Sequence, residues 1–199
     1  MLAIKRALDV AVCGVLLLLL SPLLGAIALG IKLTSPGPVM YAWKVVGKDG
    51  RFFSSWKFRS MVPNADALKG RLMAENEMSG PVFKMQRDPR ITPIGRILRK
   101  YSLDELPQLW SVFKGDMSLV GPRPPLQSEY VHFTDGQKQK LSVKPGITCL
   151  WQVSGRNQIS DFDDWVKLDL EYIRNWSLWL DLKILLLTVP AVVRGRGAA

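Results

Sequence analysis

The chain has 199 residues, 48% of them hydrophobic, and a formal net charge of +10. This size suits one domain with an added membrane element, and the charge indicates an anionic partner such as acidic lipid, phosphate-bearing substrates or nucleic acid. The single histidine, the two cysteines and the lack of a P-loop or G-x-G-x-x-G fingerprint exclude multi-histidine metal sites, a disulfide framework and those two modes of nucleotide binding.

An uncharged run from Val10 to Ile31 lies near the N-terminus. As a helix at about 1.5 Å per residue it reaches roughly 33 Å, enough to cross a bilayer. Ser21 and Pro22 interrupt it, and proline clashes with the carbonyl four residues earlier. The run is therefore either a kinked spanning helix or a helix–break–helix hairpin within one leaflet, with a cleaved signal peptide as a third interpretation. Cations on both sides favour the hairpin, since both of its ends share the cytoplasmic side.

A β-hairpin is predicted after the turn at Ser35-Pro36-Gly37-Pro38. Its strands are Val39 to Val46 and Arg51 to Met61, joined around Gly47 to Gly50. Lys57 and Arg59 lie on the second strand, where they are either solvated cations or phosphate ligands.

Four helical segments and an apolar run are predicted further along. A polar segment with little chemistry covers 65–78, a basic amphipathic helix opens at Thr92-Pro93, and further helices cover 127–140 and 161–176. The final apolar run, 184–193, is too short to cross a bilayer as a helix. It is predicted as an interfacial helix, with a buried C-terminal helix as the alternative.

The chemistry is expected at Asp104 and Glu105. Ser102 and Glu105 match a capping box, and apolar residues at helical spacing continue to Gly115, so both carboxylates belong in or just before the first turn of an amphipathic helix. Free N–H groups there keep carboxylates ionised and attract phosphate. Capping alone explains the acids but not their cationic surroundings, whereas phosphoryl transfer needs a nucleophilic carboxylate beside arginines and a metal. The cations are Lys84, Arg87, Arg90, Arg96, Arg99, Lys100 and Arg123.

Several longer motifs occur in one order over nearly the whole chain. On these motifs the sequence resembles the bacterial monotopic phosphoglycosyl transferases, also described as undecaprenyl-phosphate sugar-phosphate transferases. The motifs are Lys5-Arg6-x-x-Asp9, Ser21-Pro22, Ser35-Pro36-Gly37-Pro38, Lys57-Phe58-Arg59-Ser60-Met61, and the segments Ser102 to Gln108, Gly115 to Pro124, Lys144 to Thr148 and Trp151 to Asn157.

The resemblance implies transfer of a sugar 1-phosphate, here a hexose 1-phosphate, from a UDP-sugar to polyprenyl (undecaprenyl) phosphate with release of UMP. It implies that Asp104 attacks phosphorus to give a covalent aspartyl-phosphosugar intermediate, with Glu105 as its partner. Mg²⁺ is the implied cofactor, with Asp104 as a ligand. Arg99, Arg123 and Arg156 are the implied phosphate and nucleotide ligands, and Lys57, Arg59 and Asn157 complete the expected substrate-binding set.

The expected fold is α+β. A re-entrant helix–break–helix membrane anchor over 1–34, broken at Ser21 and Pro22, precedes a catalytic domain over 35–199 with interfacial amphipathic helices and a short antiparallel sheet. The resemblance implies the re-entrant form and the cytoplasmic face of the bacterial inner membrane, at the first membrane step of exopolysaccharide, lipopolysaccharide or other glycoconjugate synthesis. Anionic phospholipid is an expected partner and nucleic acid is not; the oligomeric state stays open, a homodimer included.

Departures from the family pattern and two rival functions complete the interpretation. Cys149 stands where a glycine is usual, the insert Asn64 to Asp88 is longer than in the smallest members, and larger relatives carry several membrane spans and a further domain before this core. The segment from Trp151 resembles members that use UDP-glucose or UDP-galactose, but the sugar stays open. The rivals are a non-catalytic basic module on anionic lipid or nucleic acid, and a phosphatase or pyrophosphatase of lipid-linked substrates.

Overall fold

The computed structural model describes residues 1–154 and 159–193. Within these ranges the fold is α+β, as predicted. The α-helices are α1 (Leu2–Leu19), α2 (Ser21–Thr34), α3 (Ala65–Lys69), α4 (Pro93–Lys100), α5 (Leu109–Lys114), α6 (Gln127–Tyr130), α7 (Asp135–Lys138), α8 (Leu150–Val153), α9 (Phe162–Arg174) and α10 (Leu178–Val193). The strands are β1 (Met40–Val46), β2 (Phe52–Phe58), β3 (Ser118–Val120) and β4 (Gly146–Thr148), and the 3-10 helices are η1 (Lys48–Gly50), η2 (Gly70–Glu75), η3 (Leu103–Gln108) and η4 (Gln139–Ser142).

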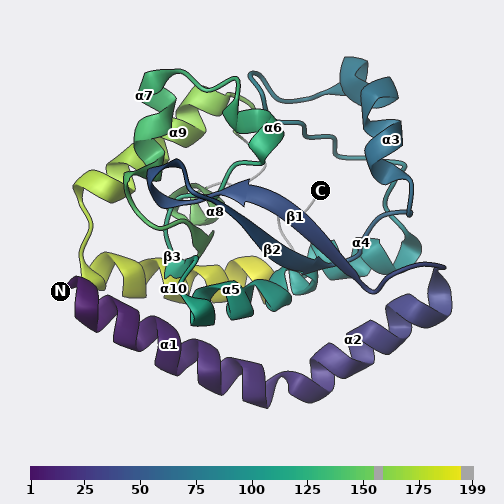
Figure 1. Cartoon of the computed structure of the whole chain (residues 1–199), viewed down its shortest axis with the longest axis horizontal. Helices are drawn as coiled ribbons and strands as arrows, with labels where there is room; N and C mark the ends of the chain where they lie inside the picture. The colour runs from purple at the N-terminus through teal and green to yellow at the C-terminus, as the bar shows by residue number, and fades with distance from the viewer. Residues whose placement is uncertain (155–158, 194–199) are drawn as a thin grey trace.

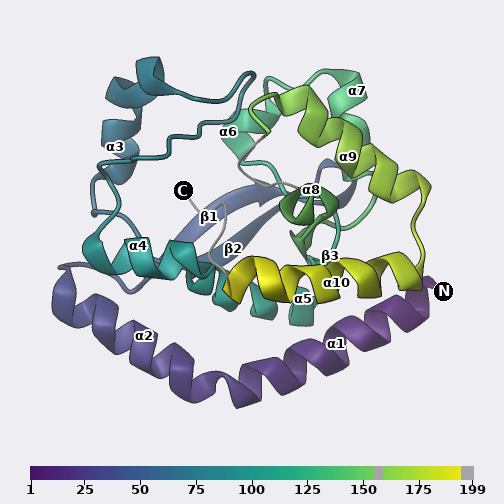
Figure 2. The same ribbon diagram turned by 180° about the vertical axis from the view of Figure 1, so that it is seen from behind.

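The elements are arranged in layers that both overall views show (Figures 1 and 2). The bent pair α1 and α2 forms one edge of the molecule. Helices α4, α5 and α10 lie next to that pair, and the β1–β2 hairpin lies beyond them. Helices α3, α6, α7 and α9 cover the side farthest from α1 and α2. The molecule therefore has a helical base and an opposite side built from short helices and loops.

The break between α1 and α2 lies where the sequence predicts it. The two helices are bent by 59°, with Leu20 between them. Pro22 has no N–H to give to the Leu18 carbonyl, and the Ser21 hydroxyl donates to that carbonyl instead, at 2.8 Å. Within the described ranges no single helix is long and apolar enough to cross a membrane. Taken together, α1 and α2 reach the required length and apolar composition.

Charged side chains of α1 hold it against the rest of the fold. Arg6 donates to the carbonyl oxygens of Val112 and Phe113 at 2.6 and 2.8 Å, where the C-terminal end of α5 leaves carbonyls without helical partners. Lys5 forms an ion pair with Asp181 of α10 at 2.6 Å. The two cations near the N-terminus therefore have a packing role that the charge pattern alone does not reveal.

The two small sheets differ in how well the sequence predicts them. Strands β1 and β2 pair antiparallel from Met40–Phe58 to Val46–Phe52, which confirms the predicted hairpin. Asp49 and Gly50 in its turn have positive φ angles of 56° and 77°. Strands β3 and β4 form a short parallel pair that the sequence analysis did not predict.

The predicted helices are confirmed with two corrections. Helix α9 covers most of the segment 161–176, α4 begins after Thr92, and the final apolar run is the second half of α10. The segment 65–78 contains only the single-turn helix α3 followed by η2, and 127–140 is divided into α6, α7 and the start of η4. Thr134 caps α7 with its side chain, which explains the division because it starts a new helix inside the predicted one.

Many large apolar side chains remain exposed on the helical base. Helix α10 buries Ile184 in the core, as the buried interpretation predicts for part of it, and exposes Trp179, Leu186 and Val189; the interfacial location stays a prediction. On α1, Leu18 and Leu19 are exposed to 75% and 69%. A soluble protein rarely exposes apolar surface this extensively, so the base is a surface for lipid or for a partner.

Candidate active site

Asp104 and Glu105 lie in the first turn of η3, which runs directly into α5. This confirms their predicted place, but the predicted capping box is wrong. Ser102 has a left-handed backbone (φ +52°) and its side chain makes no capping hydrogen bond to η3. Its left-handed conformation turns the chain sharply from α4 into η3, and this geometry replaces the extended backbone that a capping box requires. Gly115 ends α5 with a φ of +101°, as predicted.

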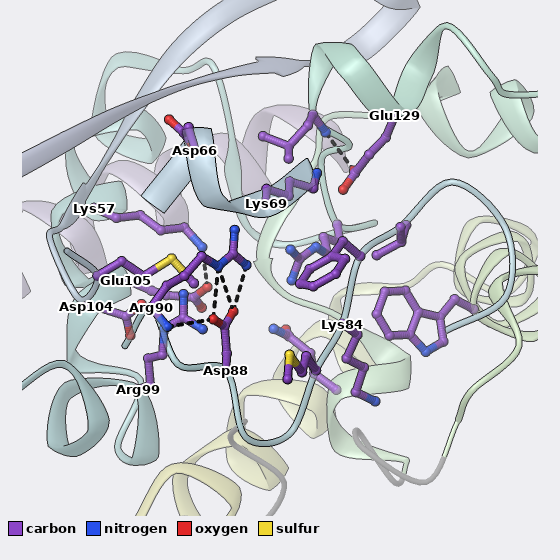
Figure 3. Close-up of a pocket in the computed structure, with 18 of the residues that line it drawn as sticks. Lys57, Asp66, Lys69, Lys84, Asp88, Arg90, Arg99, Asp104, Glu105 and Glu129 are labelled. Atoms are coloured by element: carbon purple, nitrogen blue, oxygen red, sulfur yellow. Dashed lines mark hydrogen bonds and ion pairs between the residues drawn. The ribbon is translucent and has the colours of Figure 1, made fainter. Parts of the chain in front are cut away.

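Both carboxylates line a cavity of about 300 Å³ (Figure 3). Side chains from β2, α3, α4, η3, α6, α8 and α9 contribute to its wall, together with the loops that follow η2 and β3. Figure 3 shows Lys57, Asp88, Arg90, Arg99, Asp104 and Glu105 gathered at one side of it, with Lys84 and Glu129 farther away. A polar cavity of this size can hold phosphate groups and part of a nucleotide or sugar.

Glu105 is held by a cation from the hairpin. Lys57 of β2 forms an ion pair with Glu105 at 2.6 Å, and both side chains are mostly buried. The Lys57 ammonium also lies 4.1 Å from the centroid of the Trp43 ring, a cation–π contact that fixes its position. The hairpin therefore positions a lysine at the carboxylate pair.

Asp104 is 8% exposed and lies between a like charge and two opposite charges. Burial, and then the charge of Glu105, raise its pKa, while Lys57 and Arg99 oppose that change. The carboxylate is therefore poorly solvated, and the neighbouring cations offset only part of the stabilisation that water would otherwise give.

Arg99 reaches the site because α4 packs closely on the loop after β2. Thr92 caps α4 by accepting the Gly95 N–H at 3.0 Å. A side chain at Gly95 would clash with the Ser60 carbonyl, so glycine permits the contact. One turn later, the Arg99 Nε donates to the Ser60 hydroxyl at 2.9 Å. Burial lowers the pKa of Arg99 and the charge of Asp104 opposes this, but a guanidinium stays protonated.

A second ion pair beside the site was missed by the sequence analysis. Arg90 contacts Asp88 at 2.6 Å, with both side chains buried, and also donates to the Ala65 carbonyl at 3.2 Å. Burial alone would raise the pKa of Asp88, but the hydrogen bonds from Arg90 outweigh it and lower that pKa. The pair links the 64–88 insert to the cavity. The two-residue spacing in Asp88-Pro89-Arg90 is the only sequence signal for it.

The structure brings together most of the predicted site residues. Lys57, Arg99, Asp104, Glu105 and Arg123 all line the cavity. The structure therefore gathers at one place residues that lie up to 66 positions apart in the sequence.

Arg59 lies elsewhere, in contrast to the prediction. It is buried, and its guanidinium donates to the carbonyls of Ser35 and Pro36 at 2.8 and 2.7 Å. This side chain holds the turn after α2 against the domain, so it is occupied as a structural group rather than presented to a ligand. Arg156 and Asn157, also predicted as substrate ligands, lie outside the described residues.

The insert and two tryptophans contribute wall residues that the sequence analysis did not assign to the site. Asp66, Lys69 and Phe83 of the insert line the cavity, so this segment carries more chemistry than predicted. Trp151 of α8 and Trp165 of α9 stack with their ring centroids 4.1 Å apart and close another side. Aromatic residues in an irregular loop and on a helix face give no sequence signal that separates a site wall from a core.

A metal site made by the protein alone is not found in the described part of the chain, where no three His, Cys, Asp or Glu side chains group suitably. Mg²⁺ does not need such a group, because it commonly binds one or two carboxylates together with substrate phosphates and water. The carboxylates of Asp104 and Glu105 face one polar cavity, so the donor set fits that mode of binding.

A buried Asp104 beside Glu105 and several cations, on an α+β domain with a bent apolar helix pair, suits a protein that binds phosphate groups. The model of the bacterial sugar transferase family matches residues 1–195, and the chain belongs to this family.

Three relatives cover nearly the whole chain. The galactosyl transferase CpsE of Streptococcus agalactiae serotype III (strain NEM316) is 48% identical over 98% of this chain and 43% of its own length. The undecaprenyl-phosphate galactose phosphotransferase of Salmonella typhimurium is 46% identical over 98% of this chain and 41% of its own. The exopolysaccharide production protein ExoY of Rhizobium meliloti is 41% identical over 98% of this chain and 87% of its own. The chain thus spans less than half of the first two relatives and most of the third.

Proposed function

We propose that the protein transfers a hexose 1-phosphate from a UDP-sugar to polyprenyl phosphate and releases UMP. The observation that carries the proposal is the buried Asp104 beside Glu105, Lys57 and Arg99 in one polar cavity. The names of the relatives support the substrates, since one is an undecaprenyl-phosphate galactose phosphotransferase and another, from Escherichia coli, a UDP-glucose:undecaprenyl-phosphate glucose-1-phosphate transferase.

The reaction proceeds in two displacements at the same phosphorus atom. An Asp104 carboxylate oxygen forms a bond to the sugar-proximal phosphorus of the donor, and the bond from that phosphorus to the bridging oxygen breaks. UMP leaves with that oxygen and its electron pair. An oxygen of the acceptor phosphate then attacks the aspartyl-phosphosugar, and Asp104 leaves as a carboxylate. Covalent catalysis of this kind lets the soluble donor product depart before the lipid acceptor reacts.

The surrounding residues supply charge and position. Lys57 and Arg99 offset the negative charge that accumulates when a carboxylate approaches a pyrophosphate, and Arg123 at the cavity wall is placed to bind a phosphate group. Asp104 and Glu105 would hold Mg²⁺ together with the donor's phosphates. When bound, the ion would neutralise phosphate charge.

The membrane arrangement is part of the same proposal. We infer that α1 and α2 form a re-entrant hairpin, because the 59° bend turns the chain within the apolar segment and positive side chains flank both ends. The apolar base lies at an anionic phospholipid surface on the cytoplasmic face of the bacterial inner membrane, where a soluble nucleotide sugar and a lipid phosphate meet. This is a first membrane step in polysaccharide synthesis.

The test is UMP release by purified protein with Mg²⁺, UDP-galactose or UDP-glucose, and polyprenyl phosphate. Wild type should release a stoichiometric burst of UMP without acceptor, and should turn over when polyprenyl phosphate is added. Asp104→Asn should lose the burst and reduce turnover by at least about 10³-fold, since the nucleophile is gone. Asp135→Asn is the matched control, because Asp135 is a fully exposed carboxylate on α7.

The outcome separates the rival functions. Continued UMP release without acceptor would indicate a pyrophosphatase, and absence of release with any UDP-sugar, with vesicle binding retained, would indicate a non-catalytic basic module. Failure of labelled UMP to exchange into the UDP-sugar would contradict the covalent intermediate.

A further inference from the structure

A second groove, of about 210 Å³, adjoins the active-site cavity and has the opposite character. Its wall is almost entirely carbon, formed by η3 and the start of α5 on one side and by the last turns of α10 on the other. Figures 1 and 2 both show the end of α10 beside the end of α4, where η3 begins. The side chains that matter for the argument are Leu106, Ile147, Val153, Thr188, Ala191 and Val192.

The groove and the cavity are continuous at Glu105 and Gln152, which line both. Glu105 is the immediate neighbour of Asp104 and holds Lys57 at 2.6 Å. A molecule lying in the groove therefore has its polar end at the carboxylate pair. The two spaces meet at the proposed reaction centre from different directions.

The two threonine hydroxyls of the groove wall are already satisfied within the protein. Thr188 donates to the Ile184 carbonyl at 2.8 Å, and the hydroxyls of Thr148 and Thr188 lie 2.7 Å apart. The threonines thus offer methyl groups to an occupant rather than hydrogen bonds. A UDP-sugar has no apolar part to match such a wall, because base, ribose, phosphates and sugar all carry polar groups.

The position of the groove also favours a lipid. It lies on α10, whose other faces expose Leu186, Val189 and Val193 on the apolar base. An apolar chain can therefore pass from the membrane surface along α10 to Glu105 without crossing polar protein.

We propose that this groove binds the isoprene units nearest the phosphate of the acceptor. The assignment rests on the proposed function and adds to it the lipid subsite. The donor occupies the polar cavity, the acceptor phosphate arrives from the groove, and Asp104 lies between them. An oxygen of the acceptor phosphate forms the new bond to the phosphorus of the aspartyl-phosphosugar, and the bond from that phosphorus to the Asp104 oxygen breaks as the carboxylate leaves.

The experiment fills the groove and measures the two half-reactions separately. Ala191→Trp places a large side chain in the groove, and Lys167→Trp is the control for adding a tryptophan, since Lys167 is 75% exposed on α9 and lines neither the groove nor the cavity. In Ala191→Trp we expect the KM for polyprenyl phosphate to rise roughly tenfold or more, which corresponds to the loss of a few buried methylene contacts. The burst of UMP without acceptor should remain at the wild-type level, as should both half-reactions in the control.

Three results would overturn the assignment. An unchanged KM for polyprenyl phosphate in Ala191→Trp would show that the acceptor binds elsewhere, and the same result combined with weaker vesicle binding would assign the groove to a phospholipid. Loss of the acceptor-independent burst in Ala191→Trp would show that the groove supports the donor site or the fold. A wild-type protein without any burst would instead refute the proposed function, which keeps the two failures distinguishable.

Discussion

Lys140 and Asp169 offer the sharpest test of the packing that supports the site. Lys140 of η4 and Asp169 of α9 approach to 2.5 Å, with side chains only 3% and 1% exposed. Replacement Lys140→Met leaves the carboxylate buried without its ion-pair partner, and breaking a buried pair in this way costs about 3–5 kcal/mol. Breaking a solvent-exposed ion pair would cost about 1 kcal/mol or less, so the low exposure of Lys140 and Asp169 predicts the larger cost.

The double variant Lys140→Met/Asp169→Leu should recover most of that loss, because apolar residues of similar volume can replace a buried ion pair without a large cost. The assay is urea unfolding in detergent micelles, followed by tryptophan fluorescence, with the free energy of unfolding compared among the wild type, the single and the double variants. A single variant within about 1 kcal/mol of wild type would refute the buried-pair reasoning.

The pH dependence gives an independent check of the same pair. Burial raises the pKa of Asp169 above 3.8, with Lys140 and Arg123 opposing. Between the unfolded and folded pKa values the native state binds more protons than the unfolded state, so stability falls as pH rises through that interval. Lys140→Met removes one opposing charge and raises the folded pKa further. Its destabilisation should therefore grow as pH rises through that interval; a destabilisation that shrinks with rising pH would contradict the sign.

Two further predictions concern the helix break and the thiols. Pro22→Ala restores a helical N–H, so the 59° bend between α1 and α2 should relax. The distance between spin labels at the exposed positions Leu8 and Leu33, measured by double electron–electron resonance, should then lengthen by about 5 Å. An unchanged distance would show that packing, and not the proline, sets the bend. Cys149 should not react with Ellman's reagent in the native protein at pH 8. Burial, and then the charge of Asp169, raise the pKa of its thiol well above 9.0. Reaction without denaturant would contradict its burial.

Local signals explain which elements could be predicted from the sequence. The β1–β2 hairpin, the break at Pro22 and the stop at Gly115 depend on residues adjacent in sequence, so turn chemistry is sufficient to find them. The parallel β3–β4 pair depends on three-residue strands in segments rich in glycine and proline, whose partners lie far along the chain. Such strands have too few residues to show a period. The predicted capping box does not form, because Ser102 adopts a left-handed backbone conformation that the S-x-x-E pattern does not predict.

The site residues also divide into those that a local sequence pattern predicts and those that tertiary packing places. Lys57 and Arg99, two of the residues proposed as substrate ligands, line the same cavity as the carboxylates. Arg59 shares the alternation of Lys57, but it lies just beyond the end of β2 at Phe58, where its guanidinium reaches the carbonyls of Ser35 and Pro36. Asp88 and Phe83 reach the cavity through an irregular segment, where position depends on tertiary packing and not on a repeating pattern.

The ion pair between Lys5 and Asp181 has a consequence for biosynthesis. The two residues are separated by 176 positions, so the first helix leaves the ribosome long before its anchoring partner exists. During that interval the ion pair cannot hold the apolar N-terminal segment. Under the proposed membrane arrangement, this order of synthesis would let the segment enter the bilayer before the contact between α1 and α10 closes.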